Sequence, residues 1–326
     1  AQHVVQMVSV LASNHRAILL RFLDKEPPPR HGLPPATAFP TKIAAALVLL
    51  AAALAAQMPQ NPSPMADHTR AHQRIAQAEA PGERYKLSLG NLLLAGARGQ
   101  KQSKATPLIL HFHGAPWLAE WAATRRLHRC AVLTVQLGAG SAVYARPFAD
   151  PARFGQLLDE AARAPGRAAP LQFHPIVLTS FSAGYGAIRE ILKNHANWDR
   201  LDAVVLCDGL HTGYLPEGKP GPLDAAGLEP FLAFAREAVA GRKQMLITHS
   251  EIFPGTFAST TETADWLLAS LGLRRRPVVK WGALGMQQLS EVRAGRFTLL
   301  GFAGNTAPDH TDHLHALERW LHMIRM

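Results

Sequence analysis

The sequence predicts an α/β fold, a doubly wound and mostly parallel sheet of about eight strands with helices on both faces. Three observations support this prediction. Short β-favouring runs alternate along the chain with segments of helical spacing. Several of these β runs are almost continuously hydrophobic, as parallel strands covered on both faces are. The chain has 326 residues, 48% of them hydrophobic, and can therefore bury one large core.

The β-favouring runs follow one another from residue 84 onward. They span residues 84–96, 107–114, 130–138, 173–181, 201–209, 243–250 and 296–304. The stretches between them that can form amphipathic helices span residues 117–128, 152–164, 187–198, 229–240 and 262–272. This alternation predicts parallel strands joined by right-handed crossovers. Ligands of such sheets bind beyond the carboxyl ends of the strands, so the residues directly after each β run are the candidates for a site.

An uncharged apolar run, IAAALVLLAAALAAQ (43–57), follows Lys42. It is short for a membrane span and contains Ala-Leu-Ala at 53–55 as a cleavage site. We therefore expect residues 41–57 to be a signal peptide or an uncleaved signal anchor, with an alanine-rich core helix as the third interpretation. The prediction is export to the periplasm or the medium, with membrane attachment only through an uncleaved anchor.

The segments on either side of this run complete the predicted domain organisation. Residues 1–40 contain basic side chains and a proline cluster and do not begin with Met, so we interpret them as a doubtful N-terminal extension. Residues 58–80 are polar and are predicted to be a linker or a short surface helix. Residues 81–326 are predicted to form the α/β domain.

The composition excludes several function classes. The net charge is +10, yet no run of five Lys or Arg occurs and the aromatics are not interleaved with basic residues, so no nucleic-acid partner is expected. Cys130 and Cys207 are the two cysteines, and neither belongs to a C-x-x-C pair. This argues against a zinc site or a redox motif and favours two buried thiols over a disulfide.

Ser182 stands between a β run and a helical segment, in VLTSFSAGYGAIREIL (177–192). β-favouring residues lead into Ser-Phe-Ser-Ala-Gly, and the spacing then becomes helical, with Ile188, Ile191 and Leu192 at i, i+3 and i+4. A serine in such a turn is either a helix N-cap or a nucleophile. The N–H groups of the following helix would favour an anion beside it.

This strand, turn and helix resembles the nucleophile elbow of the α/β-hydrolase superfamily, whose pattern is G-x-S-x-G. Ser180 occupies the position of the first glycine, where a small side chain is needed because strand and helix cross closely. The resemblance covers roughly residues 84–326. It implies the α/β-hydrolase fold and an esterase- or lipase-like serine hydrolase that needs no cofactor, with Ser182 as the nucleophile.

The stretch HFHGAPW (111–117) resembles the His-Gly signature that precedes the second oxyanion-hole amide in this superfamily. The resemblance implies that the backbone N–H groups of Ala115 and Ala183 face the substrate oxyanion. Gly114 lets the backbone turn there. His113 is then a structural residue that holds the loop.

The superfamily order of serine, acid and histidine implies that the general base lies near the C-terminus. Residues 301–321 contain the candidates His310 and His313. We prefer His310, which is expected in the loop before the last helix and closer to the strand end, and we keep His313 as the alternative. Metal binding by H-x-x-H is the competing interpretation, but no Glu follows in the H-E-x-x-H spacing, so we expect no metal.

Two carboxylates are candidates for the acid that orients the histidine. Asp208 directly follows AVVLC, 26 residues after Ser182, where some lipases of the superfamily have their acid. Glu251 follows MLITHS at the end of the next strand, the commoner location. We prefer Asp208, because an Asp at a strand end within CDGLH is unusual for packing alone, and keep Glu251 as the alternative.

Other residues bear on access and specificity. Four aromatics either line a pocket or belong to the core: Trp117, Phe181, Tyr185 and Tyr214. The loop at 209–230 is rich in Gly and Pro and lies where this superfamily inserts its lid. It is too short for an elaborate lid, so we predict a short cap loop and open access.

The resemblance therefore implies a hydrolase of carboxylic esters that works through an acyl-enzyme intermediate. The substrate is a small-molecule or polymeric ester. A peptidase or amidase of the same fold is the nearest alternative. A non-catalytic binding protein of this fold is a second alternative, supported by the departure at Ser180.

Overall fold

The computed structural model describes residues 71–96, 105–166 and 168–326. The predicted extension (1–40), the predicted signal segment (41–57) and most of the predicted linker lie outside the described residues. Within those described ranges, no helix combines the length and the hydropathy needed to cross a bilayer.

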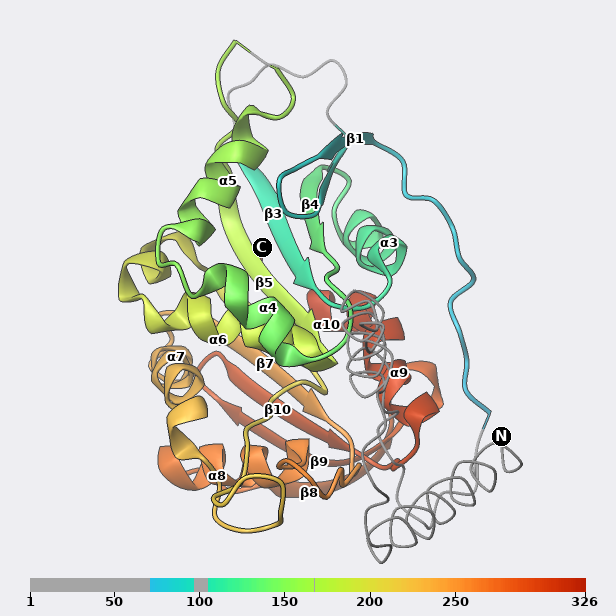
Figure 1. Cartoon of the computed structure of the whole chain (residues 1–326). Coiled ribbons are helices and arrows are strands. Elements are labelled where there is room, and N and C mark those ends of the chain that lie inside the picture. The colour runs from blue at the N-terminus through green and yellow to red at the C-terminus, as the bar shows by residue number, and fades with distance from the viewer. Residues whose placement is uncertain (1–70, 97–104, 167) are drawn as a thin grey trace, which may run out of the picture. The chain divides into compact units, whose positions relative to one another are not determined.

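A ten-stranded sheet lies at the centre of the described domain (Figure 1), in the order β1-β2-β4-β3-β5-β6-β7-β10-β9-β8. The strands are β1 (Glu83–Lys86), β2 (Asn91–Ala95), β3 (Thr106–Phe112), β4 (Cys130–Val135), β5 (Phe173–Phe181), β6 (Ala203–Cys207), β7 (Gln244–His249), β8 (Arg276–Trp281), β9 (Gln287–Ala294) and β10 (Phe297–Phe302). The central strands from β4 to β10 in this order pair in parallel, and antiparallel strands extend both ends. The predicted mostly parallel α/β sheet is confirmed.

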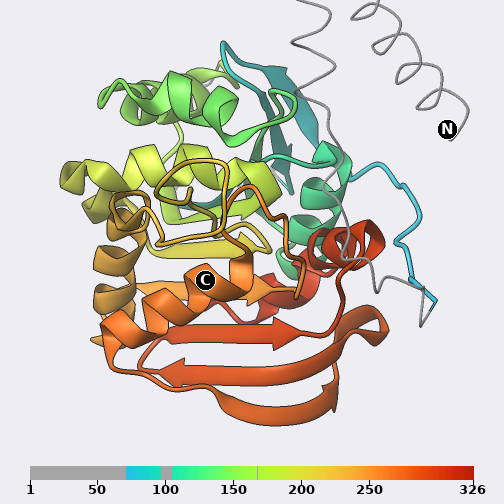
Figure 2. The same ribbon diagram turned by 60° about the horizontal axis from the view of Figure 1, so that its bottom comes forward.

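The sheet has ten strands where the sequence predicts about eight. The run at 84–96 forms a hairpin, β1 and β2, because the chain reverses at Gly90, whose φ is +87°. Strands β8 and β9 are not predicted, because their antiparallel pair lies near the surface and contains Arg, Lys, Gln and Glu in place of a continuous hydrophobic run. Figure 2 shows this extension as arrows of alternating direction beside β10.

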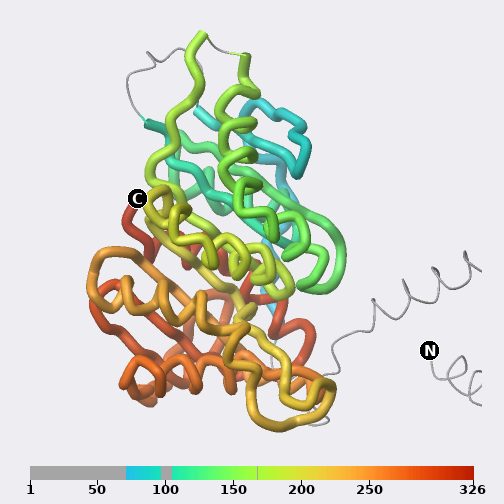
Figure 3. The backbone as a smooth tube through the Cα atoms, turned by 60° about the vertical axis from the view of Figure 1, so that its left-hand side comes forward, coloured from blue at the N-terminus to red at the C-terminus, as the bar shows by residue number. Residues whose placement is uncertain are grey.

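Helices cover both faces of the sheet. They are α3 (Pro116–Arg126), α4 (Ser141–Phe148), α5 (Arg153–Arg163), α6 (Tyr185–Lys193), α7 (Glu229–Val239), α8 (Thr260–Leu271), α9 (Ala307–His315) and α10 (Leu317–His322), with 3-10 turns at 182–184, 195–200, 225–227 and 283–285. Helices α4 to α8 share one hydrophobic core with the sheet, and α3, α9 and α10 share the core on the other face. Figure 3 is viewed from the side of α4 to α7, which lie beside one another from green to orange.

The register of the parallel strands aligns apolar side chains in rows across the sheet. One buried row runs through Leu133, Leu110, Leu178, Val204, Met245 and Phe297. The strands that share this register all end at one edge of the sheet, so the residues that follow them are brought together there.

Helix α4 is absent from the predicted elements. Its eight residues, SAVYARPF, include Pro147 and bury only Tyr144 and Phe148 fully, so they show no apolar periodicity over several turns.

Strand β8 ends the sheet. Val279 and Trp281 on this strand are 78% and 73% exposed. The same strand contains Pro277 and Lys280, and the register with β9 shifts between them.

Both cysteines are buried free thiols, as predicted. Burial raises the pKa of Cys130 to about 12, and burial together with the nearby Asp208 charge raises the pKa of Cys207. Neither thiol is therefore a reactive nucleophile at neutral pH.

Leu110 belongs to the buried row, and its replacement tests how tightly the core is packed. We expect Leu110→Ala to lower the free energy of unfolding by about 2–5 kcal/mol, because a cavity remains. Val279→Ala is the control and should change it by less than about 0.5 kcal/mol. Denaturant unfolding of both variants measures this difference, and equal effects would contradict the assignment of the core.

Candidate active site

Three residues with left-handed backbone conformation follow three neighbouring strands. His113 follows β3, Ser182 follows β5 and Asp208 follows β6, with φ of +67°, +46° and +45°. These strands are adjacent and parallel, so the three turns lie at the same edge of the sheet. Such a conformation costs about 1–3 kcal/mol per residue and persists only where the surrounding structure enforces it. Backbone strain of this kind clusters at functional sites, which makes this edge the candidate active site.

Ser182 lies on the sharp turn between β5 and α6. A Cβ atom at Gly184 would lie 2.2 Å from the carbonyl oxygen of Phe112, so a glycine is needed for this close approach to β3. A Cβ atom at Gly209 would likewise lie 2.7 Å from the carbonyl oxygen of Ser182. The Ser182 side chain is half-buried, and its hydroxyl makes no hydrogen bond with any described residue.

The fold accommodates Ser180 in place of the first glycine of the elbow pattern. Ser180 is fully buried, and it pairs with Phe112 and Leu206 on the neighbouring strands. Its hydroxyl finds no hydrogen-bond partner within the described ranges. The position therefore accepts serine by size and leaves one polar atom unsatisfied.

His310 lies in the first turn of α9, and not in the loop before that helix as expected from the sequence. The helix begins early because Thr306 and Asp309 form a capping box. In it, Thr306 Oγ1 accepts from the N–H of Asp309 at 3.2 Å, and Asp309 Oδ2 accepts from the N–H of Thr306 at 3.0 Å. The buried His310 ring places Nδ1 2.6 Å from Oδ2 of Asp208.

The Asp208 carboxylate is buried and accepts four hydrogen bonds. Oδ1 accepts from the N–H of Ser250 at 2.9 Å and the hydroxyl of Thr260 at 2.7 Å, while Oδ2 accepts from the Ser250 hydroxyl at 2.7 Å and from His310. Burial alone raises the pKa of Asp208, but the charges of His313 and His310 and the hydrogen bonds from His310 and Thr260 hold it well below its ordinary value. An ionised carboxylate only accepts, so Nδ1 of His310 donates to it and Nε2 remains for a second partner.

The two alternative residues lie elsewhere. Glu251 is exposed after β7, and its carboxylate makes no hydrogen bond or ion pair with a described residue. His313 is buried, with Nδ1 2.8 Å from the Thr248 hydroxyl. The structure therefore brings His310 to Asp208, and it directs the Nδ1 atoms of His310 and His313 to different partners.

Phe181, the residue before Ser182, packs its ring against the ring of His310. Its ring lies 4.4 Å from the ring of His310 and stacks on that of His113 at 5.9 Å, measured between centroids. No hydrogen bond joins Ser182 to His310 in the described part of the chain. Hydrogen bonds of catalytic groups are often long without substrate and tighten when it binds.

Ala115 and Ala183 lie at the N-terminal ends of helical elements. Ala115 is the N-cap of α3, and Ala183 belongs to the 3-10 turn that leads into α6. Neither N–H group has a backbone or side-chain acceptor among the described residues. Both N–H groups therefore lack an internal acceptor within the described part of the chain, as the first N–H groups of a helix do.

Tyr144 fixes the loop before Ala115. Its hydroxyl lies 2.8 Å from Nδ1 of His113 and accepts from the N–H of Leu137 at 3.0 Å. Gln136 Oε1 accepts from the N–H of Gly114 at 2.9 Å and lies 3.2 Å from the Tyr144 hydroxyl. The sequence does not single out Tyr144, because α4 is itself not predicted.

The four aromatics that the sequence leaves open as pocket or core residues lie in three different settings. Phe181 contacts the histidine of the site. Tyr185 and Tyr214 are buried, and the Tyr214 hydroxyl donates to Glu262 at 2.8 Å. Trp117 is half-buried and packs edge-on against His315 of α9.

Several buried histidines give the domain a predictable pH dependence. Burial lowers the pKa values of His111, His113 and His249 to about 4, with smaller contributions from neighbouring charges. In the unfolded chain these groups bind protons below about pH 6.5, whereas in the folded protein they stay neutral to about pH 4. The unfolded state therefore binds more protons in this window, and stability falls as the pH drops through it.

Between pH 6.5 and 4 the unfolded state binds more protons than the folded state. We expect His111→Asn to reduce this difference by about one proton, so that stability falls less steeply with decreasing pH. His322→Asn, an exposed position on α10, is the control and should leave the slope unchanged. Denaturant unfolding at closely spaced pH values measures the slope. A wild-type stability that does not fall between pH 6.5 and 4 would contradict the neutral burial of these rings.

Comparisons with known proteins give matches to solved structures alone. No protein-family model matches the chain, and no curated protein does. A thermophilic esterase, Est2 of the Planctomycetes species Thermogutta terrifontis, is 16% identical with a TM-score of 0.44, over 76% of this chain and 91% of that chain.

Two further solved structures show similar values. The enterobactin esterase FES from Shigella flexneri is 12% identical with a TM-score of 0.43, over 77% of this chain and 62% of that chain. A puromycin-hydrolyzing peptidase of Mycobacterium tuberculosis is 15% identical with a TM-score of 0.38, over 74% of this chain and 39% of that chain. This chain thus spans well under half of the peptidase.

The fold follows from the strand order and the geometry of its carboxyl edge. The sheet is parallel at its centre and begins with an antiparallel hairpin. Ser182 lies on a strained turn between a strand and a helix, and the pair of His310 and Asp208 lies at the same edge of the sheet. The described domain has the α/β-hydrolase fold.

Proposed function

We propose that the protein is a serine hydrolase that cleaves carboxylic esters. The observation that supports this most directly is the 2.6 Å contact between His310 Nδ1 and the buried Asp208 carboxylate. This contact orients a histidine at the sheet edge where Ser182 occupies its strained turn. A nucleophile, a base and a group that orients the base are the parts that acyl transfer needs.

In the proposed mechanism, His310 Nε2 takes the proton of the Ser182 hydroxyl as Oγ attacks the ester carbonyl carbon. Asp208 stays ionised and stabilises the imidazolium through the Nδ1–H bond. The imidazolium then protonates the departing alcohol, which leaves an acyl group on Ser182. A water molecule, deprotonated by His310, attacks this acyl group, and the acid leaves as Ser182 regains its proton.

The N–H groups of Ala115 and Ala183 are the proposed donors to the tetrahedral oxyanion. One such donor typically contributes about 10²–10³-fold to kcat. The Tyr144 network determines where the Ala115 N–H points, because it holds His113 and the Gln136 side chain that binds Gly114.

The short segment after β6 favours a small-molecule ester as the substrate of the proposed site. The segment after β6 contains one isolated bridge, between Tyr214 and Leu223, and a single 3-10 turn before α7. It forms a short loop in place of a helical lid, so substrate would reach Ser182 without displacing a cap domain.

Hydrolysis of p-nitrophenyl esters, with matched p-nitroanilides and a fluorophosphonate label, tests the function. We expect Ser182→Ala and His310→Asn to lower kcat at least about 10⁴-fold and Asp208→Asn about 10³–10⁴-fold. Glu251→Gln, at an exposed carboxylate, is the matched control and should retain most of the activity. His313→Asn tests the alternative base and should lower kcat less than His310→Asn does. Wild-type protein that is folded yet unlabelled, or Ser182→Ala labelled equally, would refute the proposal, and anilides cleaved as fast as esters would indicate an amidase.

Tyr144→Phe tests the support of the oxyanion loop. Loss of the hydroxyl leaves His113 Nδ1 and the Leu137 N–H without this partner, so we expect kcat to fall about tenfold or more with little change in KM. Tyr85→Phe, which removes a hydroxyl bound to exposed Glu83, is the matched control. Equal activity of the two variants would rule out this role of Tyr144.

A further inference from the structure

Residues 72–80 form an extended strap that runs past α9 and leads into β1 (Figures 1 and 2). This described part of the predicted linker is bound to the domain at several points. Ile75 packs against the core of α3, α9 and α10, and Ala80 is buried in the same core. The strap is therefore part of the fold.

The polar contacts of the strap concentrate on α9, the helix that bears His310. An Arg74 guanidinium nitrogen binds Oδ1 of Asp312, and a second donates to the carbonyl oxygen of Pro308 at 2.9 Å. The N–H of Ile75 donates to Nδ1 of His315 at 3.1 Å. These contacts reach both the first and the last turn of α9.

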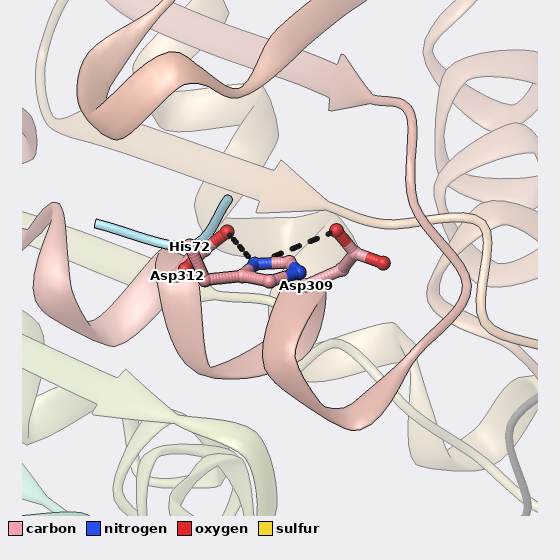
Figure 4. Close-up of side chains that lie close together, drawn as sticks. All are labelled: His72, Asp309 and Asp312. Carbon is pink, nitrogen blue, oxygen red and sulfur yellow. Dashed lines mark hydrogen bonds and ion pairs between the residues drawn. The ribbon is translucent and has the colours of Figure 1, made fainter. Parts of the chain in front are cut away.

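Asp312 is the centre of this attachment. Its carboxylate is fully buried, and Nδ1 of His72 lies 2.9 Å from Oδ2 while Arg74 holds Oδ1. Figure 4 shows the His72 ring between Asp312 and Asp309, whose Oδ1 is 4.0 Å away. Loss of a partner from a buried carboxylate is destabilising, so the Arg74 and His72 contacts help to keep Asp312 in the interior.

Asp312 and His310 face opposite sides of the helix. They are two residues apart, which is about 200° around an α-helix. One side of α9 is thus fixed to the strap through Asp312, and the other is fixed to the sheet edge through His310 and Asp208.

His72, Asp309 and Asp312 also place potential ligand atoms within 4.8 Å of one another, as a metal site would. One oxygen of each carboxylate already has another partner. Asp309 Oδ2 accepts from the N–H and the hydroxyl of Thr306, and Arg74 lies directly on Asp312. A cation would face the Arg74 guanidinium across one carboxylate, so the cluster favours an ion pair.

We propose that Arg74 and His72 are positioning residues, which bind Asp312 and, through Arg74, the carbonyl oxygen of Pro308, and so hold α9 where His310 reaches Asp208. This inference rests on the proposed function of His310. Neither residue touches the reacting atoms. Loss of the strap contacts would displace the histidine, and a displacement of about 1 Å can cost about 10²-fold in rate.

The test compares Arg74 variants of the full chain in ester hydrolysis, below the thermal midpoint of each. We expect Arg74→Ala to lower kcat about tenfold or more while KM changes less than about twofold. Arg74→Lys should recover most of kcat. Arg276→Ala is the matched control, because Arg276 also pairs with a buried carboxylate, Glu291, at the far end of the sheet, and it should keep the wild-type kcat.

A double variant separates positioning from stability if Arg74→Ala folds poorly. Arg74→Met with Asp312→Asn removes both charges and should regain thermal stability, yet kcat should stay low because α9 is no longer anchored. Wild-type kcat in this double variant, or in folded Arg74→Ala, would overturn the proposal. Loss of kcat on dialysis against EDTA, restored by Zn²⁺, would overturn it in favour of a metal site.

Ser182→Ala measured in parallel distinguishes the two possible failures. If that variant keeps full activity, the proposed function has failed and the strap inference fails with it. If it is inactive while Arg74→Ala behaves as wild type, only the strap inference fails.

Discussion

The buried carboxylate of Asp208 is the constraint on which the arrangement of the site depends. A charge in the interior persists only when hydrogen bonds replace its hydration, and here the donors come from the segment after β7, the start of α8 and the first turn of α9. Elements far apart in the chain are thereby held at one point of the sheet edge. The charges of His313 and His310, together with the hydrogen bonds from His310 and Thr260, hold the pKa of Asp208 well below its ordinary value despite burial.

The backbone is strained at the ends of the three strands that lead to the site. His113, Ser182 and Asp208 adopt a backbone conformation that L residues avoid, and each is enforced by close packing or by a network. Glycines at 184 and 209 allow the backbones on either side of Ser182 to approach closely. The Tyr144 hydroxyl holds the His113 side chain in place through its contact with Nδ1. The stability of the large parallel core offsets the cost of holding these three turns.

The sequence predicts the parallel strands well, because buried parallel strands are hydrophobic on both faces and stand out as continuous runs. It also indicates Ser182, His310 and Asp208, because each follows such a run or precedes the last helix, and the structure brings the latter two into contact. It misses β8 and β9, whose exposed faces are polar, and α4, which is short and contains Pro147. It places His310 in a loop, since the effect of the Thr306 capping box on the helix start is hard to judge from composition. Tyr144 and Arg74 contact residues that are far away in the sequence, so no local sequence pattern predicts these contacts.

The polar extension of the sheet through β9 and β8 leaves a strand with unpaired backbone groups at the end of the described sheet. Val279 and Trp281 would make such a strand prone to pair with another chain. Pro277 cannot donate to a new ladder, Lys280 adds a charge, and the shift in register between them bends the edge. The border of this sheet is thus protected against intermolecular growth by its own residues.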